Sequence, residues 1–523
     1  MKNIIKTKPA AQIKPNWEKA TADQLAEKYS SLLHDESKVT GGILSSVSFP
    51  ESIEQLAGEV KYCYDNNISM RVSASRTGLT AGAMPREGEH LFSLTKLQGI
   101  EGLQGIEGLV DAKIVRAKAG TTLRDIYAWT DENHPELYFP VDPTEQGASV
   151  SGAVATNAGG ARSFKYGSMR RWVVGLTVIL SSGDILKFKR GEYIAQDGEF
   201  VISDSLGQRI LKAAEIPKPK TKNCLGYSFS SNVDLIDVFV GSEGTLGIIA
   251  EVELLLAERP KHRLYVLQFF EDEKQGLKFV SSLRAEKRLN ALSIEYCDQR
   301  SLDFVRTSPI IKTNKPAQAL KDSHKAVVIV EIVLENEEQL GDAYEVLAEL
   351  LDNLGVSMDD SIAGMEEVDL REIKIFRHAI PEAVNQLIAL RKQDFPGLHK
   401  LATDMAVPDR YLFEVFDLYK SRLTKAGLDF AIFGHAGDNH FHVNLAPRNQ
   451  AELDLAKQLY LELAKEIVSM QGAVSAEHGI GVLKKSFLKL QYGEEILGEF
   501  KKIKQAFDPK CLLNKGVLFD VQA

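Results

Sequence analysis

Cysteine is scarce in this chain of 523 residues, which contains only four. The cysteines are far apart and form no Cys-x-x-Cys pair, so the sequence offers neither the ligand spacing of an iron–sulfur cluster nor a disulfide framework. A reducing cytoplasm is therefore the expected location.

Excess positive charge and long apolar runs are also missing. The net charge of −9 gives no electrostatic footprint for nucleic acid or for an anionic membrane. No segment approaches the roughly 20 apolar residues of a membrane span, and residues 1–15 carry lysines but no apolar signal-peptide core. We expect a small-molecule substrate, no nucleic acid, and at most a peripheral association with the inner face of a membrane.

Three common enzyme motifs are absent as well. The chain has no GxGxxG, GxxxxGK(S/T) or HExxH. The usual signatures of nicotinamide-binding Rossmann enzymes, P-loop enzymes and zincins are therefore missing. The chain is longer than one hydrophobic core usually allows, so two or more domains are expected.

The sequence does contain a dense histidine cluster. His435, His440 and His442 fall within eight residues, although the whole chain has only 11 histidines. An apolar run at 430–433 predicts a buried strand, and a glycine-rich turn follows it. In the next strand, 441–445, apolar and polar residues alternate, so His440 and His442 are expected on one face and apolar side chains on the other.

A second motif, SAEHGIG at 475–481, carries Glu477 and His478. Together with His435 and His442, Glu477 would complete a set of ligands for a divalent metal, which leaves His478 as a base. Residue spacing alone also allows a solvated hairpin and an ordinary loop, and this alternative stays open.

Small residues are concentrated in two stretches of the first half. In residues 70–85, small side chains allow backbone N–H groups to close around an anion such as pyrophosphate, with a plain turn as the alternative. In residues 139–167, alanines and glycines leave room for a large flat cofactor, with Ser149, Thr156 and Asn157 as hydrogen-bond donors. A tightly packed contact between a helix and a sheet is the alternative for this second stretch.

Other segments are predicted from periodicity and turn residues. Residues 238–256 are expected to form a strand, a glycine-rich turn and a second strand, and the tandem LQGIEG at 97–108 is expected to lengthen a hairpin. Helices are expected at 22–33, 52–66, from about 122, at 381–391 and at 451–470.

Strands and helices alternate after residue 260. This alternation predicts a second domain, in which an antiparallel sheet is covered by helices on one face. The expected strands are 264–270, 291–296 and 326–334, and the expected helices are 273–286 and 337–354.

Together and in this order, these motifs resemble the FAD-linked oxidases of the vanillyl-alcohol-oxidase superfamily. The similar branch holds D-lactate dehydrogenases, glycolate oxidase subunits and D-2-hydroxyglutarate dehydrogenase. The resemblance covers about 44–519 and implies an α+β fold. It implies a lead-in at 1–43, a PCMH-type FAD-binding domain of two α+β subdomains at 44–258, a substrate-binding cap at 259–485, and a C-terminal segment at 486–523 that returns to the flavin.

The resemblance also implies which residues bind FAD. SRTGLTAG corresponds to the pyrophosphate loop, SEGTLGII binds FAD through its backbone, and Asn514 corresponds to an asparagine near the isoalloxazine ring. No histidine lies between positions 135 and 260, so a non-covalent FAD is expected. The implied FAD contacts are Ser75, Arg76, Thr77, Gly78, Leu79, Gly82, Pro140, Asp142, Pro143, Thr144, Ala148, Ser149, Gly152, Thr156, Asn157, Gly160, Ser163, Tyr166, Gly167, Glu243, Gly244, Gly247, Ile248, Ile249 and Asn514.

The chain departs from the family pattern at several positions. Relatives commonly have GxGT in the pyrophosphate loop, where this chain has Ala74 and Arg76, and Lys515 replaces a frequent proline. Arg76 is expected to add a phosphate contact. Asn439 and His440 stand where many relatives have Gly-Asn, and the role of His440 stays open between metal preference and substrate contact.

The metal-dependent relatives carry a GHxGDGNxHxN-like motif, which GHAGDNHFHVN resembles here. The resemblance implies that His435, His442 and Glu477 bind a divalent metal. Zinc is the first candidate, with manganese and iron as alternatives.

The implied reaction is oxidation of a D-2-hydroxy acid, with D-lactate as the first candidate, to the 2-oxo acid. Arg377 would bind the substrate carboxylate, Lys400 would make a second contact, and His478 would remove the hydroxyl proton while a hydride passes to flavin N5. Because the chain lacks iron–sulfur ligands, an external acceptor is needed: a quinone, a cytochrome, an electron-transferring flavoprotein or an iron–sulfur subunit. A homodimer is compatible with the resemblance.

Two other functions share parts of this pattern. One is a non-redox FAD transferase of the alkylglycerone-phosphate synthase type, and the other is the flavin subunit of a larger glycolate oxidase-like complex. The motifs around His435, Arg377 and Glu477 favour a catalytic dehydrogenase over both.

Overall fold

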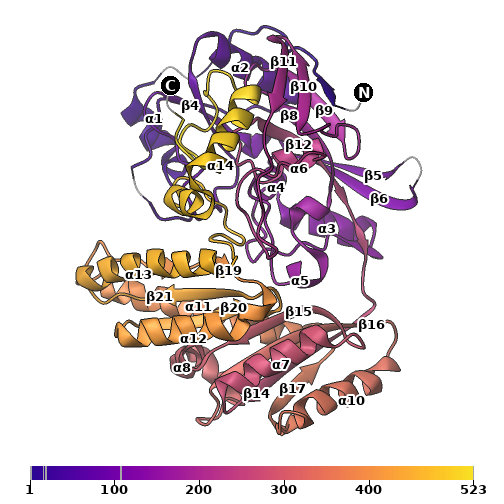
Figure 1. The fold of residues 1–523 in the computed structure, drawn as a ribbon, viewed down its shortest axis with the longest axis vertical. Helices are drawn as coiled ribbons and strands as arrows, with labels where there is room; N and C mark the ends of the chain where they lie inside the picture. The colour runs from indigo at the N-terminus through magenta and orange to yellow at the C-terminus, as the bar shows by residue number, and fades with distance from the viewer. Residues whose placement is uncertain (1–2, 16, 18–19, 40, 107–108, 522–523) are drawn as a thin grey trace.

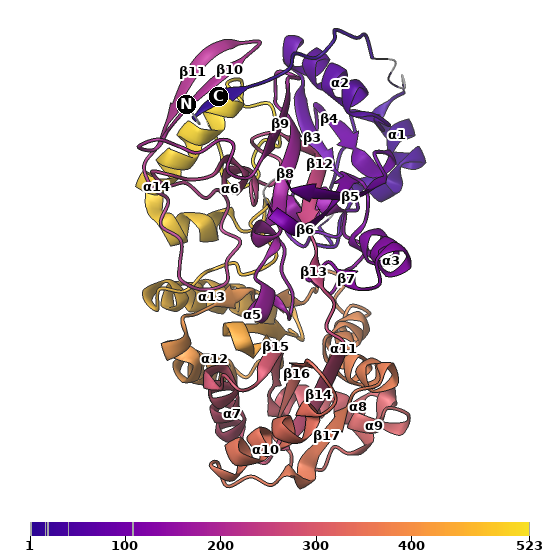
Figure 2. The same cartoon turned by 90° about the vertical axis from the view of Figure 1, so that its right-hand side faces the viewer.

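The structure is a computed structural model that describes residues 3–15, 17, 20–39, 41–106 and 109–521. Its elements form two bodies, one above the other in Figures 1 and 2. The upper body holds the chain up to β13 (Ala257–Glu258) together with α14 (Lys485–Phe507). The lower body holds the elements from β14 (His262–Phe270) to α13 (Gln450–Ser469), so the predicted domain boundary at 258 falls between β13 and β14. The domain limits themselves stay a prediction.

Several small sheets build the upper body. Its strands are β1 (Ile4–Lys6), β2 (Ser46–Ser48), β3 (Ser69–Ser73), β4 (Glu89–Ser93), β5 (Ile100–Ile106), β6 (Leu109–Lys118), β7 (Leu137–Tyr138), β8 (Val173–Ile179), β9 (Ile185–Lys189), β10 (Glu199–Asp204), β11 (Gly207–Lys212), β12 (Ile248–Leu255) and β13. The largest sheet has the order β5-β6-β12-β8-β9 and is antiparallel, whereas the sheet β2-β4-β3 is parallel. β1 joins the hairpin β10-β11, and β7 pairs with β13.

The helices of the upper body begin mostly where capping residues predict. They are α1 (Ala22–Lys28), η1 (Ser30–Leu33), α2 (Ile53–Asp65), η2 (Leu94–Lys96), α3 (Leu123–Asn133), α4 (Val150–Thr156), α5 (Ser163–Tyr166), η3 (Met169–Arg171), α6 (Leu235–Phe239) and α14. Ser52 caps α2 and Thr122 caps α3 through their hydroxyl groups. The expected helix 22–33 divides into α1 and the 3₁₀ turn η1.

One expected strand of the upper body is wrong. The residues from Val238 were predicted to enter a strand, but they end the short helix α6, which Asp234 caps. Val238, Phe239 and Val240 are all fully buried. A short apolar run buried on all sides has no periodicity to distinguish a strand from a helix.

The predicted hairpin around the LQGIEG repeat is confirmed. β5 pairs with β6 in antiparallel register and projects from the upper body. Positions 107–108, at the end of the repeat, lie outside the described residues.

The lower body is built on one antiparallel sheet, as predicted. Its strands are β14, β15 (Asn290–Cys297), β16 (Ala326–Leu334), β17 (Ser361–Gly364), β18 (Leu401–Ala402), β19 (Met405–Ala406), β20 (Phe430–His435) and β21 (His440–Leu445). Their order is β17-β14-β16-β15-β20-β21-β18, and β19 also pairs with β21. The lower helices are α7 (Glu273–Ala285), α8 (Gln299–Thr307), η4 (Pro309–Lys312), α9 (Lys315–Gln318), α10 (Gln339–Asp352), η5 (Met358–Asp360), α11 (Glu367–Arg391), η6 (Asp409–Tyr411), α12 (Leu412–Lys425), η7 (Ala436–Asp438) and α13.

Helices cover both faces of this sheet, so the expectation of one covered face is wrong. Leu264 and Val266 of β14 belong to the apolar core that includes α7 and α10. Tyr265 and Leu267, which point the other way, belong to a separate core with α8 and α11. The strongly apolar sequence of β16, buried on both faces, is typical of such a central strand.

The helix predicted at 381–391 is much longer than expected. α11 begins at Glu367 and contains Pro381 in its interior. Proline removes the hydrogen bond to the carbonyl group four residues earlier and normally ends a helix. Here Phe376, Ile380 and Val384 are fully buried at helical spacing, and their burial outweighs that loss.

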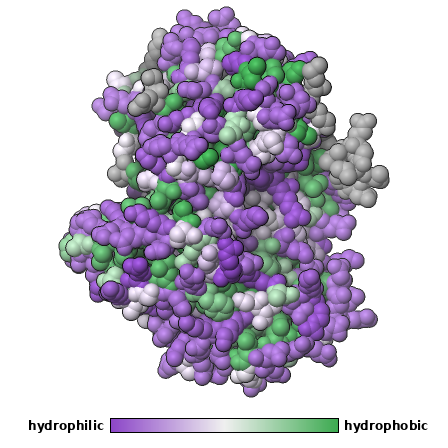
Figure 3. Space-filling view, viewed as in Figure 1, coloured by the Kyte–Doolittle hydropathy of each residue, from purple (hydrophilic) through white to green (hydrophobic). Residues whose placement is uncertain are grey.

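The C-terminal segment lies on the upper body, where α14 contacts β11. Ser181 donates a hydrogen bond from its hydroxyl group to the carbonyl oxygen of Phe507, at the end of α14. The face of the molecule shown in Figure 3 is predominantly hydrophilic. Among the described residues, no helix is both long and apolar enough to cross a membrane.

Candidate active site

A cleft of about 320 Å³ lies where the two bodies meet. From the upper body it is lined by the loop after β3, by α4, by the turn before β12 and by Asn514. From the segment that links the two bodies and from β21 it is lined by His442, Glu477 and His478. The predicted flavin loops and three members of the predicted catalytic cluster therefore border one cavity.

Most of the predicted FAD contacts line this cleft. They are Ser75, Arg76, Thr77, Gly78, Leu79, Gly82, Pro143, Thr144, Ala148, Ser149, Gly152, Thr156, Glu243, Gly244, Ile248, Ile249 and Asn514. Two lining residues, Asp35 and Leu94, lie outside the stretches that the sequence indicated. The other lining residues of the upper body that were not predicted individually fall within the small-residue stretches 70–85 and 139–167: Val72, Ser73, Ala74, Thr80, Ala83, Glu145, Ser151, Ala153, Ala155, Ala158 and Gly159.

The remaining predicted contacts are not among the lining residues of the cleft. They are Pro140, Asp142, Asn157, Gly160, Ser163, Tyr166, Gly167 and Gly247. Asn157 accepts hydrogen bonds from the Ser168 hydroxyl group and the Arg170 N–H. A Cβ at Gly160 would lie 2.1 Å from the carbonyl oxygen of Asp142, so this glycine permits close packing. Direct FAD contact by these eight residues stays a prediction.

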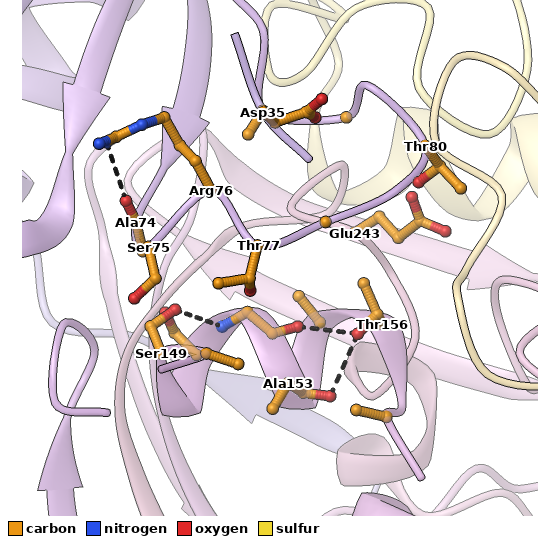
Figure 4. A pocket seen from close by; sticks show the side chains of 18 of the residues that line it. Asp35, Ala74, Ser75, Arg76, Thr77, Thr80, Ser149, Ala153, Thr156 and Glu243 are labelled. Atoms are coloured by element: carbon orange, nitrogen blue, oxygen red, sulfur yellow. Dashed lines mark hydrogen bonds between the residues drawn. The ribbon is translucent and has the colours of Figure 1, made fainter. Parts of the chain in front are cut away.

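The chemistry of the lining fits a dinucleotide cofactor. None of the backbone N–H groups of residues 75–79 donates a hydrogen bond within the described part of the chain, so these donors are available to an anion. The hydroxyl oxygen of Ser73 is buried and also has no partner among the described groups. In Figure 4, Thr77 points from the loop towards α4, where Ser149, Ala153 and Thr156 present small side chains.

Arg76 has an unusual backbone conformation in this loop. Its φ of 57° lies in the left-handed region that favours glycine, which agrees with its position at a glycine of the family pattern. Its guanidinium group donates to the carbonyl oxygen of Ala74 at 3.2 Å, and burial lowers its pKa. The side chain lines the cleft, where its charge is available to a phosphate group.

Glu243 joins the flavin turn to the catalytic segment. Its carboxylate accepts hydrogen bonds from the backbone N–H groups of Ile480 and Gly481, each at 2.7 Å. Burial raises the pKa of Glu243 to about 7, although these two N–H groups oppose the shift. Asn514 ties the same turn to β3, because it donates to the Glu243 carbonyl oxygen and accepts from the Val72 N–H.

The three histidines of the cluster lie on one hairpin. β20 and β21 pair so that His435 lies directly opposite His440, whereas His442 lies opposite Phe433. Gly434 permits this close pairing: it has a φ of 132°, and a Cβ there would lie 2.9 Å from the carbonyl oxygen of His440. The predicted alternation is confirmed, because Phe441, Val443 and Leu445 are buried in the core.

Glu477 completes a group of four potential metal ligands with these histidines. One ligand atom from each of His435, His440, His442 and Glu477 lies within 4.8 Å of all the others. Three imidazole nitrogens and one carboxylate oxygen suit a divalent ion such as zinc, manganese or iron. The residues present therefore fit the metal that the sequence implies.

Buried groups outside the cluster orient its members. The Nδ1 atom of His435 lies 2.5 Å from Glu295, and the Nε atom of Arg377 lies 2.8 Å from the same carboxylate. This arrangement turns His435 Nε2 towards Glu477, at 3.3 Å. A carboxylate on the far nitrogen is the usual support of a metal-binding histidine. Burial opposes the protonation of His435, but Glu295 and Glu477 outweigh it and raise its pKa to about 9.

Lys222 reaches the cluster from the upper body. Its ammonium group contacts Glu477, lies 3.5 Å from Asp438 and donates to the Gly160 carbonyl oxygen at 2.9 Å. Burial alone would raise the pKa of Glu477, but Lys222 and His435 lower it well below its usual range. Glu477 is therefore ionised and able to bind a cation.

Asp404 holds the segment that carries Glu477 and His478. Its carboxylate accepts hydrogen bonds from the backbone N–H groups of Glu477 and His478, both at 3.0 Å, and pairs with Lys484 at 2.7 Å. His478 Nδ1 lies 3.6 Å from Asp404 Oδ2. Burial lowers the pKa of His478 despite this carboxylate, so its imidazole is neutral and able to accept a proton at neutral pH.

The two predicted substrate contacts are not among the lining residues of the cleft. Arg377 is linked to the cluster through Glu295, and its side chain is 24% exposed. Lys400 is half-buried immediately before β18, and burial lowers its pKa. Their contact with a substrate stays a prediction. The sequence analysis did not identify Lys222 and Glu295. Asp404 could have been noticed as the one charged residue in TDMAVP.

Comparison with known proteins agrees with the two-body architecture. Residues 45–189 match the family described as "FAD binding domain", and residues 259–518 match "FAD linked oxidases, C-terminal domain". The chain belongs to the FAD-linked oxidase superfamily. This FAD-linked oxidoreductase is 28% identical over 505 residues to a D-lactate dehydrogenase of Anaerostipes hadrus, covering 94% of this chain and 93% of that one.

One further relative and one solved structure also resemble this FAD-linked oxidoreductase. It is 27% identical over 481 residues to a D-2-hydroxyglutarate dehydrogenase of Xanthomonas citri pv. viticola, covering 91% and 89% of the two chains. Among solved structures it resembles alkyldihydroxyacetonephosphate synthase, with a TM-score of 0.62 and 12% identity over 98% of this chain and 88% of that one. At this identity the second likeness concerns the fold alone.

Proposed function

We propose that this protein is a dehydrogenase that oxidises a D-2-hydroxy acid, with a D-lactate-like substrate as the first candidate, to the 2-oxo acid. The observation that carries the proposal is the shared cleft, in which His442, Glu477 and His478 border the same cavity as the flavin loops. A substrate in this cavity would contact both the base and the cofactor.

The roles of the residues follow from their surroundings. His478, neutral and held near Asp404, accepts the hydroxyl proton. His435, His442 and Glu477 hold the divalent cation, and Arg377 and Lys400 bind the substrate carboxylate. When bound, FAD supplies the hydride acceptor and the cation supplies a Lewis acid for the hydroxyl group.

The cofactor is held without a covalent bond in this proposal. The N–H groups of residues 75–79 and the guanidinium group of Arg76 bind the pyrophosphate, and α4 provides a wall of small side chains. Electrons then pass to an external acceptor: a quinone, a cytochrome, an electron-transferring flavoprotein or an iron–sulfur subunit. The cytoplasmic location and the homodimer belong to the same proposal.

Anaerobic flavin bleaching tests the reaction. Purified holoprotein is mixed with D-lactate, glycolate, D-2-hydroxyglutarate or D-malate, before and after prolonged dialysis against a chelator. We expect one D-acid to bleach the flavin within seconds, L-lactate to have no effect, and metal removal to abolish the bleaching. If FAD is bound and none of the acids bleaches it, the dehydrogenase proposal fails and a transferase, for which the fold likeness exists, becomes the better candidate.

A further inference from the structure

His440 is the one member of the four-residue cluster to which the proposed function gives no task. It is fully buried, and neither of its ring nitrogens makes a hydrogen bond of ordinary geometry to a described group. A buried polar atom without a partner is unfavourable, because it has lost its hydrogen bonds to water. Nε2 lies near the Asp404 carboxylate, but Nδ1 has no hydrogen-bond partner among the described groups, which indicates a partner other than a protein side chain.

The hairpin places His440 inside the cluster, at distances similar to those of the two assigned histidine ligands. His435 and His440 are directly paired across the strands, and the rings of His440 and His442 lie 4.4 Å apart on one face of β21. The ring of His435 lies 5.4 Å from that of His440 and 5.3 Å from that of His442. The strand register thus gives His440 a position equivalent to those of the two assigned ligands.

The two nitrogens of His440 face different groups. Nδ1 lies 3.9 Å from Glu477, on the side where the cluster converges, and Nε2 lies 3.2 Å from Asp404. The same division occurs at His435, where Glu295 supports Nδ1 and Nε2 faces Glu477. A carboxylate behind one nitrogen fixes the tautomer and leaves the other nitrogen as an electron-pair donor.

We infer that His440 is a fourth protein ligand of the metal site and binds a divalent transition metal through Nδ1, with Asp404 holding its Nε2–H. The inference rests on the proposed function only in that both use the same metal site. Three imidazoles and one carboxylate retain zinc more firmly than the two imidazoles and one carboxylate assigned otherwise, and zinc can expand to five ligands when a substrate hydroxyl group binds.

X-ray absorption at the zinc edge counts the imidazole ligands directly. Zinc-loaded wild-type holoprotein, with no substrate added, should show three imidazoles per zinc ion. His440→Asn should show two, because asparagine can still donate to Asp404 but has no ring nitrogen facing Glu477. His262→Asn, a half-exposed histidine of the lower body, should keep three.

Zinc affinity, measured by competition with a chromogenic chelator, separates a ligand from a positioning residue. We expect His440→Asn to weaken zinc binding by more than about 100-fold, beyond the 10–100-fold range of supporting residues. His262→Asn should leave the affinity unchanged, and FAD absorbance together with the melting temperature should show that both variants fold.

Two results would overturn the inference: two imidazoles per zinc ion in the wild type, or an unchanged zinc affinity in His440→Asn. The wild-type absorption measurement decides the matter even if His440→Asn does not fold. Failure of the proposed function looks different, because the wild type would then show three imidazoles per zinc ion while no D-acid bleaches the flavin.

Discussion

His478 stands at the boundary between the cleft and a buried carboxylate. It lines the cavity, stacks near His442 with 5.7 Å between ring centres, and lies 3.6 Å from Asp404. A neutral imidazole with a carboxylate behind it is well suited to accept a proton and to stabilise the charge that results.

Replacing His478 by alanine should therefore separate catalysis from cofactor binding. We expect His478→Ala to slow flavin reduction about 10²–10⁴-fold, the usual contribution of a general base, with FAD content unchanged. Stopped-flow absorbance under anaerobic conditions measures the rate, and His262→Ala is the control. A rate within twofold of the wild type would show that another group accepts the proton.

Arg76 combines backbone strain with a charged side chain that borders the cleft. A non-glycine residue in this conformation costs about 1–3 kcal/mol, and a charge-assisted hydrogen bond contributes about 1.5–3 kcal/mol. Arg76→Gly should relieve the strain, so the apoprotein should melt at the same or a higher temperature. It should also lose the phosphate contact, so the Kd for FAD should rise about tenfold or more. Thermal unfolding of the apoprotein tests the first expectation, and titration of the apoprotein with FAD, followed by flavin fluorescence, tests the second. An unchanged Kd would remove Arg76 from the phosphate site.

The sequence predicted a residue correctly where the local alternation of polar and apolar residues determines the face on which its side chain lies. Alternation along β21 placed His440 and His442 on one face, and the structure bears this out. Glu295 and Lys222 could not be predicted, because the cluster residues that they contact, His435 and Glu477, lie more than 100 residues away and one charged side chain in a single sequence carries no record of its partner.

At the scale of elements, the segment between α13 and α14 is shaped by one aspartate. Asp404 is fully buried, accepts N–H groups from the segment and pairs with Lys484, whose side chain is 11% exposed. Because the segment has no regular secondary structure, this carboxylate replaces the hydrogen bonds that a helix or sheet would supply.

Removing the charge of Asp404 should destabilise the protein strongly. Asp404→Asn leaves Lys484 buried without its partner, which costs about 3–5 kcal/mol. The double variant Asp404→Asn/Lys484→Met should recover part of that loss. Lys485→Met, which breaks a pair with the exposed Asp520, should change stability by less than about 1 kcal/mol. Thermal unfolding of the holoprotein compares all three, and a mild effect of Asp404→Asn alone would mean that the segment is held by other contacts.

Elements were predictable where capping and periodicity agreed, as for α2 and α3. The errors have physical causes. Pro381 suggested the start of a helix, but α11 continues through it because its side chains are buried against the rest of the lower body. The apolar run from Val238 has no hydrophobic periodicity that would distinguish a helix from a strand. Which faces of the lower sheet are covered depends on long-range packing, which local patterns do not encode.

At the scale of the whole molecule, the candidate site is held together by contacts between the two bodies. Arg162, next to α5, forms a bidentate pair with Glu331 of β16 at 2.8 and 3.0 Å. Lys222 and Glu243 add polar contacts from the upper body to the segment around Glu477. The relative position of flavin loops and catalytic segment therefore depends on a few buried ion pairs and hydrogen bonds.

The Arg162–Glu331 pair gives the sharpest test of this dependence. Arg162→Met and Glu331→Gln should each speed hydrogen exchange at α5 and β16 and slow flavin reduction. The double variant should add little, because either substitution already breaks the pair, and the coupling should be about 1–3 kcal/mol. Arg263→Met removes another cation near Glu331, at 3.3 Å, from within the lower body. It should leave exchange at α5 unchanged. Additive effects, or equal effects of Arg162→Met and Arg263→Met, would show that the two bodies are positioned by apolar packing instead.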